Sequence, residues 1–152
     1  MKNLLLLFAV MVSFYSCTKE SDDIANTFDY KGQWELVKMT GSVEGSETTG
    51  SDMEWQETYI INENNTFTKT RTQGESTKTV SGTYTFSEEG LVDESVSQEV
   101  AYIEFIYDKT SEIIGSCYFS GNPKEYLYFT SKSKLKSTWE SCDGPGLEYI
   151  KK

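Results

Sequence analysis

The segment WQETYIINENNTFTKTRTQ, residues 55–73, alternates between two faces on either side of a short polar turn. Before the turn, Trp55, Glu57, Tyr59 and Ile61 share one face, because successive side chains of a strand point to opposite sides. The turn itself, NENN (62–65), contains asparagines, which tolerate the positive φ angles of a tight hairpin. The pattern predicts two antiparallel strands, 54–62 and 66–73.

Short runs rich in Thr, Tyr, Phe, Ile and Val continue along the chain between turn signals. They predict further strands, namely 33–40, 77–87, 98–108, 113–120, 125–131, 134–140 and 147–151. No window contains a helical stripe of three turns or more. Because most neighbouring strands are joined by short connections, we expect an all-β fold, an antiparallel up-and-down β-barrel of about eight strands. A two-sheet sandwich is the alternative.

Four motifs occur along the rest of the chain: the GxW motif formed by Gly32 and Trp34 in YKGQWELV, then NENNTF, SGTYTF (81–86) and CDGPGLEYIKK (142–152). Together they resemble the lipocalin-like domain lipoproteins of the Bacteroidetes. The resemblance covers the chain from about residue 30 to 152. It implies a lipocalin-like β-barrel over 30–152 whose closed end is plugged by the indole of Trp34. It also implies a binding site for a small, largely apolar ligand outside the cytoplasm.

The N-terminus has the features of an export signal. A positive start, MKN, precedes an apolar run over residues 4–12 that is too short to span a bilayer. Ser16 and Cys17 follow, which resembles a bacterial lipoprotein signal. We therefore expect residues 1–16 to be a signal peptide, Cys17 to carry palmitate or a similar acyl group, and residues 17–29 to be a flexible tether. An ordinary secretory signal, leaving Cys17 as an odd thiol, is the alternative.

The predicted location follows from this signal. Acyl chains anchor a protein to a membrane because each buried methylene contributes about 0.8 kcal/mol. The acidic stretch KESDD (19–23) resembles the tag that sends such lipoproteins to the outer face of the outer membrane. We expect an outer membrane lipoprotein displayed on the cell surface, with a periplasm-facing protein as the alternative. Contact with the membrane would then be made through the lipid anchor only.

Composition narrows the classes of function. The chain has 14 basic and 24 acidic residues, and this charge disfavours nucleic acid as a partner. It contains no histidine, which removes the usual acid and base at neutral pH and the commonest transition-metal ligand. The acidic loop near Glu88 and Asp93 lacks the ligand spacing of a calcium loop. We expect no enzymatic activity, no cofactor and no metal.

The predicted interior of the barrel is aromatic with a few charged groups. The residues of this phase that we assign to ligand binding are Trp55, Glu57, Tyr59, Phe67, Arg71, Tyr84, Phe86, Phe105 and Tyr107. Charge at Glu57, Lys69 and Arg71 must be paired, hydrated or used. These three residues anchor a polar ligand group or lie at a solvated barrel mouth. The aromatic residues line a cavity or fill the core, and Glu57 has no evident acidic partner in the cavity.

Two further cysteines, Cys117 and Cys142, lie in the predicted barrel. Export to an oxidising compartment would allow them to form a disulfide. Two buried free thiols are the alternative.

Two functions are compatible with these features. The first is a surface-anchored lipoprotein, monomeric, whose barrel binds a small hydrophobic or amphipathic ligand. The second is an interaction module with a closed core whose loops bind a protein or a glycan. A continuous apolar void of some hundreds of cubic ångströms would favour the first.

Overall fold

The computed structural model describes residues 29–93, 98–117 and 121–152. The predicted signal peptide, Cys17 and almost all of the predicted tether lie outside these residues. The elements, in chain order, are β1 (Gly32–Thr40), β2 (Thr48–Thr49), the 3-10 helix η1 (Gly50–Asp52), β3 (Gln56–Ile61), β4 (Thr66–Gln73), β5 (Ser76–Asp93), β6 (Gln98–Tyr107), β7 (Lys124–Ser131), β8 (Lys134–Ser137), the 3-10 helix η2 (Trp139–Cys142) and β9 (Gly146–Lys151). In this part of the chain, no helix is long and apolar enough to cross a bilayer.

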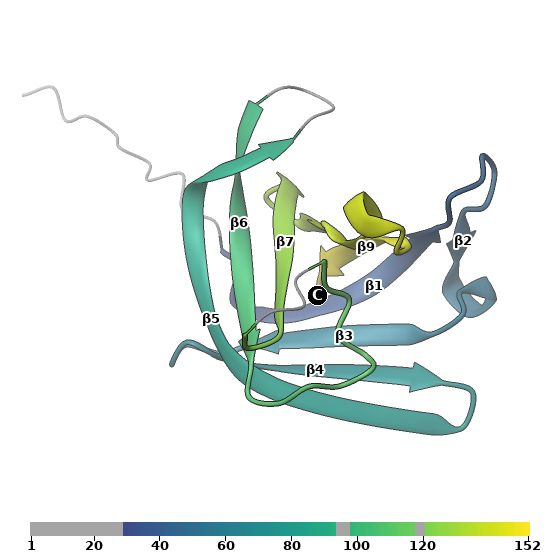
Figure 1. The fold of residues 1–152 in the computed structure, drawn as a ribbon, viewed down its shortest axis with the longest axis horizontal. Coiled ribbons are helices and arrows are strands. Elements are labelled where there is room, and N and C mark those ends of the chain that lie inside the picture. The colour runs from purple at the N-terminus through teal and green to yellow at the C-terminus, as the bar shows by residue number, and fades with distance from the viewer. Residues whose placement is uncertain (1–28, 94–97, 118–120) are drawn as a thin grey trace, which may run out of the picture.

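The strands form one closed antiparallel barrel (Figure 1). Each strand from β3 to β8 pairs with the next one along the chain, and β1 pairs with both β3 and β9. The described barrel therefore has eight strands in up-and-down order, and β2 is a short addition to the edge of β1. This confirms the predicted all-β, lipocalin-like barrel class and excludes the sandwich.

The β3–β4 hairpin forms where the sequence predicts it. The backbone N–H of Asn62 donates to the carbonyl of Thr66 at 2.9 Å, and Asn65 has a φ of 60°, which asparagine tolerates.

A different constraint operates at Gly82, where β5 lies close to β6. A Cβ atom there would overlap the carbonyl oxygen of Ile106, so only glycine allows this approach.

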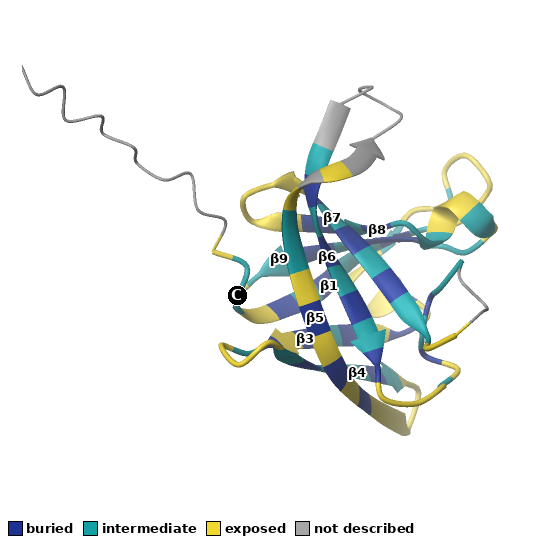
Figure 2. Cartoon of the chain, turned by 60° about the vertical axis from the view of Figure 1, so that its left-hand side comes forward, coloured by how far each residue is buried: buried dark blue, intermediate teal, exposed yellow. Residues whose placement is uncertain are grey.

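Burial alternates along the strands, as Figure 2 shows by its bands of buried and exposed residues. In β4, for example, Phe67, Lys69 and Arg71 are buried, whereas the threonines between them are only partly covered. For each strand whose inward-facing residues were predicted from the sequence, those residues lie on the buried face of the strand. The core therefore lies inside the barrel and includes one large cluster of aromatic and aliphatic side chains.

One end of the barrel is closed by aromatic packing. Trp34 is completely buried, and its indole Nε1 donates to the carbonyl of Tyr30 at 2.7 Å. The ring of Tyr30 stacks on Phe86 with centroids 4.4 Å apart, and Trp34 meets Phe129 edge-on. Gly32, at the start of β1, is exposed and has a φ of 108°. Any opening for a ligand must therefore lie at the other end of the barrel.

Some predicted boundaries were wrong. Residues 113–117 of the expected strand 113–120 are a loop, because their backbone groups are held by buried side chains instead of a neighbouring strand. The expected strand 134–140 ends at Ser137 and is followed by η2. Strand β5 continues past the predicted residue 87 to Asp93, after an irregularity in its pairing with β6.

Candidate ligand-binding site

Four charged side chains form a buried ion network inside the barrel. Lys69 of β4 places its Nζ 3.1 Å from Glu57 Oε1 of β3 and 2.7 Å from Glu125 Oε1 of β7. Arg71 donates from Nε to Glu57 Oε2 at 2.5 Å. Three of these side chains are no more than 4% exposed, and that of Arg71 is 8% exposed. Two positive and two negative groups thus balance one another away from water.

Tyrosine hydroxyls complete this ion network. Tyr59 donates to Glu125 Oε2 at 2.5 Å, Tyr107 donates to the same oxygen, and Tyr149 donates to Glu57 Oε1 at 2.6 Å. Burial raises the pKa of each of these phenols well above its usual range, and the neighbouring carboxylates raise it further. The phenols therefore stay protonated and remain hydrogen-bond donors.

The sequence left two possible places for the charged interior residues, namely a polar anchor inside the barrel or a solvated barrel mouth. Glu57, Lys69 and Arg71 are paired and buried, so they do not form a solvated barrel mouth. The expectation that Glu57 has no acidic partner in the cavity was wrong, because Lys69 bridges it to Glu125. The sequence analysis did not identify Glu125 as an interior residue. It lies near the start of β7, on the same buried face as Leu127 and Phe129.

Most aromatic residues assigned to ligand binding pack against one another in the core. Tyr59, Phe67, Phe105 and Tyr107 are at most 1% exposed, and their rings meet at centroid distances between 4.6 and 6.3 Å. Two other aromatic residues from the same set, Tyr84 and Phe86, lie with Tyr30 at the closed end. Their role in ligand binding stays a prediction.

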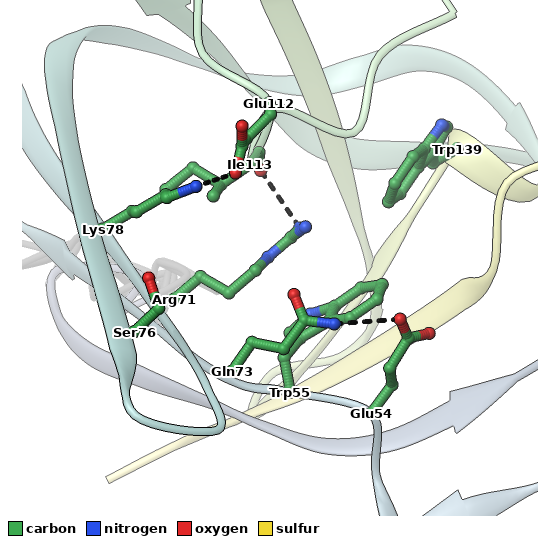
Figure 3. A pocket seen from close by; sticks show the side chains of 9 residues that line it. All are labelled: Glu54, Trp55, Arg71, Gln73, Ser76, Lys78, Glu112, Ile113 and Trp139. Carbon is green, nitrogen blue, oxygen red and sulfur yellow. Dashed lines mark hydrogen bonds and ion pairs between the residues drawn. The ribbon is translucent and has the colours of Figure 1, made fainter.

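A pocket of about 400 Å³ lies beside the ion network, at the end of the barrel away from Trp34. It is lined by Glu54, Trp55, Arg71, Gln73, Ser76, Lys78, Glu112, Ile113 and Trp139. Figure 3 shows Arg71 reaching into the middle of these side chains, with the two tryptophans on different sides of it. Of the residues assigned from the sequence, Trp55 and Arg71 line this pocket, and Glu57 holds Arg71 from behind.

The floor of the pocket is a cation stacked on an indole. The guanidinium carbon of Arg71 lies 4.1 Å from the ring centroid of Trp55 and 6.0 Å from that of Trp139. Trp55 is 7% exposed, and its Nε1 has no hydrogen-bond partner among the described residues. The pocket thus combines apolar walls with a buried donor that lacks an acceptor.

The rim of the pocket carries paired polar groups. Lys78 forms an ion pair with Glu112, and Gln73 donates to Glu54 at 3.0 Å (Figure 3). These rim residues are exposed, so water competes for their interactions. The polar interactions of the rim are therefore weaker than those of the buried floor.

A disulfide connects two walls of the pocket. Cys117 and Cys142 are bonded, which confirms the predicted pairing. Cys117 ends the described part of the loop that carries Glu112 and Ile113, and Cys142 ends η2, which carries Trp139. Between them, Gly115 packs so closely on Trp139 that a Cβ atom would overlap the indole. The disulfide thus ties the loop to the indole wall.

The sequence did not assign Trp139 or Ile113 to the site. Both lie in segments predicted as strands but folded as a loop and a 3-10 helix, so alternation gave no signal for them. Among the described residues, no group of three or more acidic or cysteine side chains is arranged to hold a metal ion. Comparisons with protein-family models, curated proteins and solved structures find no match to this chain.

Proposed function

We propose that this chain is a lipid-anchored binding protein that takes a small amphipathic molecule into the pocket between Trp55, Arg71 and Trp139. The observation that carries the proposal is the pocket itself. Its volume of about 400 Å³ is within the range of small-molecule sites, and its walls combine two indoles with a few polar groups. The ligand sits at the barrel end, because buried aromatic rings and the ion network fill the interior.

The other parts of the proposal come from the sequence. Acylated at Cys17, the protein is held at the outer membrane, at the cell surface, and touches the membrane through this anchor alone. It acts as a monomer, takes no nucleic acid as partner, and performs no catalysis. The absence of histidine supports the lack of catalysis, and the acidic charge supports the lack of a nucleic acid partner.

A second candidate function is favoured by the closed core. A barrel filled by its own side chains serves as a rigid frame for loops, and such loops can bind a protein or a glycan. The complete burial of Lys69 between two glutamates is the observation behind this candidate.

Binding of an uncharged, solvent-sensitive naphthalene dye, such as Prodan, separates the two functions. We expect saturable binding with about one-to-one stoichiometry. Replacing Trp139 with alanine removes the most accessible aromatic wall of the pocket. It should weaken binding about fivefold or more, the effect of losing about 1 kcal/mol.

The matched control is Tyr102→Ala, which removes an aromatic side chain from β6 next to inward-facing Ile103. Its ring packs beside Tyr126 and does not line the pocket. Dye affinity should be unchanged. If the folded, monomeric protein binds no dye, the small-ligand function is wrong and the closed-core interaction module replaces it.

A further inference from the structure

We propose that the pocket selects a carboxylate-bearing apolar molecule, with the carboxylate bound by Arg71 and by Nε1 of Trp55. This inference rests on the proposed small-ligand function and names the class of its ligand.

The floor offers donors and lacks a free acceptor. The indole Nε1 of Trp55 can only donate, and it is buried without a partner among the described residues. Arg71 uses Nε for Glu57 and Nη2 for the carbonyl of Ile113. Its guanidinium has further N–H groups that take part in no hydrogen bond with the described residues. A ligand that satisfies this floor must therefore bring acceptor oxygens.

The buried carboxylate next to the pocket floor, that of Glu57, is already engaged. Both carboxylate oxygens of Glu57 accept hydrogen bonds inside the barrel, one from Tyr149 and one from Arg71. At the rim, Glu112 pairs with Lys78 and Glu54 accepts from Gln73. A ligand donor group, such as an ammonium, would therefore find its carboxylate partners at the exposed rim, on Glu54 and Glu112, and not at the floor. A ligand carboxylate binds the floor without displacing any of these interactions.

The charge of the pocket lining does not exclude a carboxylate ligand, although the chain as a whole is acidic. The four charged residues that line the pocket are two cations, Arg71 and Lys78, and two anions, Glu54 and Glu112. The anions are on the exposed rim, where water screens them, whereas Arg71 is buried at the floor. Arg71 already pairs with Glu57 through Nε, and its remaining N–H groups can form charge-assisted hydrogen bonds with a second carboxylate. The apolar part of the ligand lies against Trp139.

Three probes with the same ring test the inference by calorimetry on the purified protein: 2-naphthoate, 2-naphthamide and 2-naphthylmethylammonium. We expect 2-naphthoate to bind about tenfold more tightly than 2-naphthamide, and the ammonium most weakly. Equal affinities, or tightest binding of the ammonium, overturn the carboxylate inference and leave the proposed function standing. If no probe binds, and the uncharged dye fails as well, the proposed function itself is wrong.

Two conservative variants locate the carboxylate. Trp55→Phe keeps an aromatic ring under Arg71 but removes the indole donor, so the preference for naphthoate over naphthamide should fall about threefold or more. Trp139→Phe is the matched control, because it shortens the opposite wall for both probes equally and should leave their affinity ratio unchanged. An unchanged ratio in Trp55→Phe overturns the part assigned to Trp55.

A measurement on the unaltered protein gives the same answer without a mutation. In ¹⁵N-labelled protein, the indole N–H resonance of Trp55 should move downfield when 2-naphthoate binds, as expected for a donor that gains an acceptor. The resonance of Trp34 is an internal reference, because its Nε1 already donates to the carbonyl of Tyr30. A Trp55 resonance that stays unchanged at saturation overturns the proposed hydrogen bond.

Discussion

Lys69 is a charged residue with no exposed surface, and its ammonium is the link between Glu57 and Glu125. Without it, two carboxylates would face each other inside the barrel with one guanidinium to balance them. We expect Lys69→Met to lower the free energy of unfolding by about 3–5 kcal/mol, because removing one partner of a buried ion pair leaves uncompensated charge. Urea unfolding monitored by circular dichroism measures this.

Lys124→Met is the matched control for this substitution. Lys124 precedes Glu125 in β7, but its side chain is 37% exposed and pairs with Glu104 on the outer face. The same change there should cost less than about 1 kcal/mol. Similar losses in the two variants would contradict a special role of the ion network in stability.

We expect the free energy of unfolding to depend on pH in the alkaline range, because the phenols of Tyr59, Tyr107 and Tyr149 are buried. Burial raises their pKa in the folded state above the ordinary value of 10.0, whereas the unfolded chain ionises near that value. The unfolded state therefore loses these protons first. Their contribution to stability is fully present below about pH 10 and decreases as the pH rises above it.

Urea unfolding between pH 8 and 11 tests this expectation. The fall in unfolding free energy above pH 10 should be less steep in Tyr59→Phe, which removes one of the three raised phenols. Tyrosinate absorbance gives an independent measurement, because these buried phenols should ionise at a higher pH than the exposed phenols. Complete ionisation of all tyrosines near pH 10, with the barrel still folded, would contradict the prediction.

At the scale of elements, the disulfide stabilises both the fold and the pocket. It closes a segment with a sequence separation of 25 residues, and a loop of this length contributes about 3 kcal/mol in the chain-entropy model. Replacing Cys117 and Cys142 by serine should lower the free energy of unfolding by about this amount. Because the loop and η2 are then no longer tied together, dye affinity should fall as well. Unchanged stability and affinity would contradict this.

The strands were predictable because one physical rule, burial of alternate residues, operates along their whole length. The same rule places Glu57, Lys69 and Arg71 inside the barrel and would have placed Glu125 there too. The alternation rule gives a wrong prediction for residues 113–117, because this apolar stretch is of the kind that forms strands. Their carbonyl and amide groups bond to Arg71 and Glu125, two side chains distant in sequence. Alternation carries no information about such contacts.

Only part of the pocket was predictable for the same reason. Trp55 and Arg71 are adjacent to or within strands, and the sequence assigned both of them to the binding site. Trp139 lies in η2, whose orientation depends on the disulfide and on close packing against Gly115. The position of a side chain in such an irregular turn follows from tertiary contacts rather than from local periodicity.

At the scale of the whole molecule, the proposed acylation of Cys17 would determine where the protein resides. We expect Cys17→Ser to abolish labelling by radioactive palmitate and to release the protein from the membrane fraction, because no acyl anchor remains. Serine at both Cys117 and Cys142 is the control, since these cysteines form the disulfide and should not affect labelling. Absence of label on the unaltered protein would refute the lipid anchor.

The ion network also has a consequence for the order of folding. Its four charges come from β3, β4 and β7, and the bond between Lys69 and Glu125 joins residues 56 positions apart. A nascent chain that ends before β7 holds Lys69 and Arg71 with Glu57 as their only carboxylate in the network. Compacting β1 to β6 at that stage would bury an unbalanced positive charge, which is strongly unfavourable. We therefore expect this charge to disfavour compaction of the N-terminal strands alone and to favour folding after most of the chain is available.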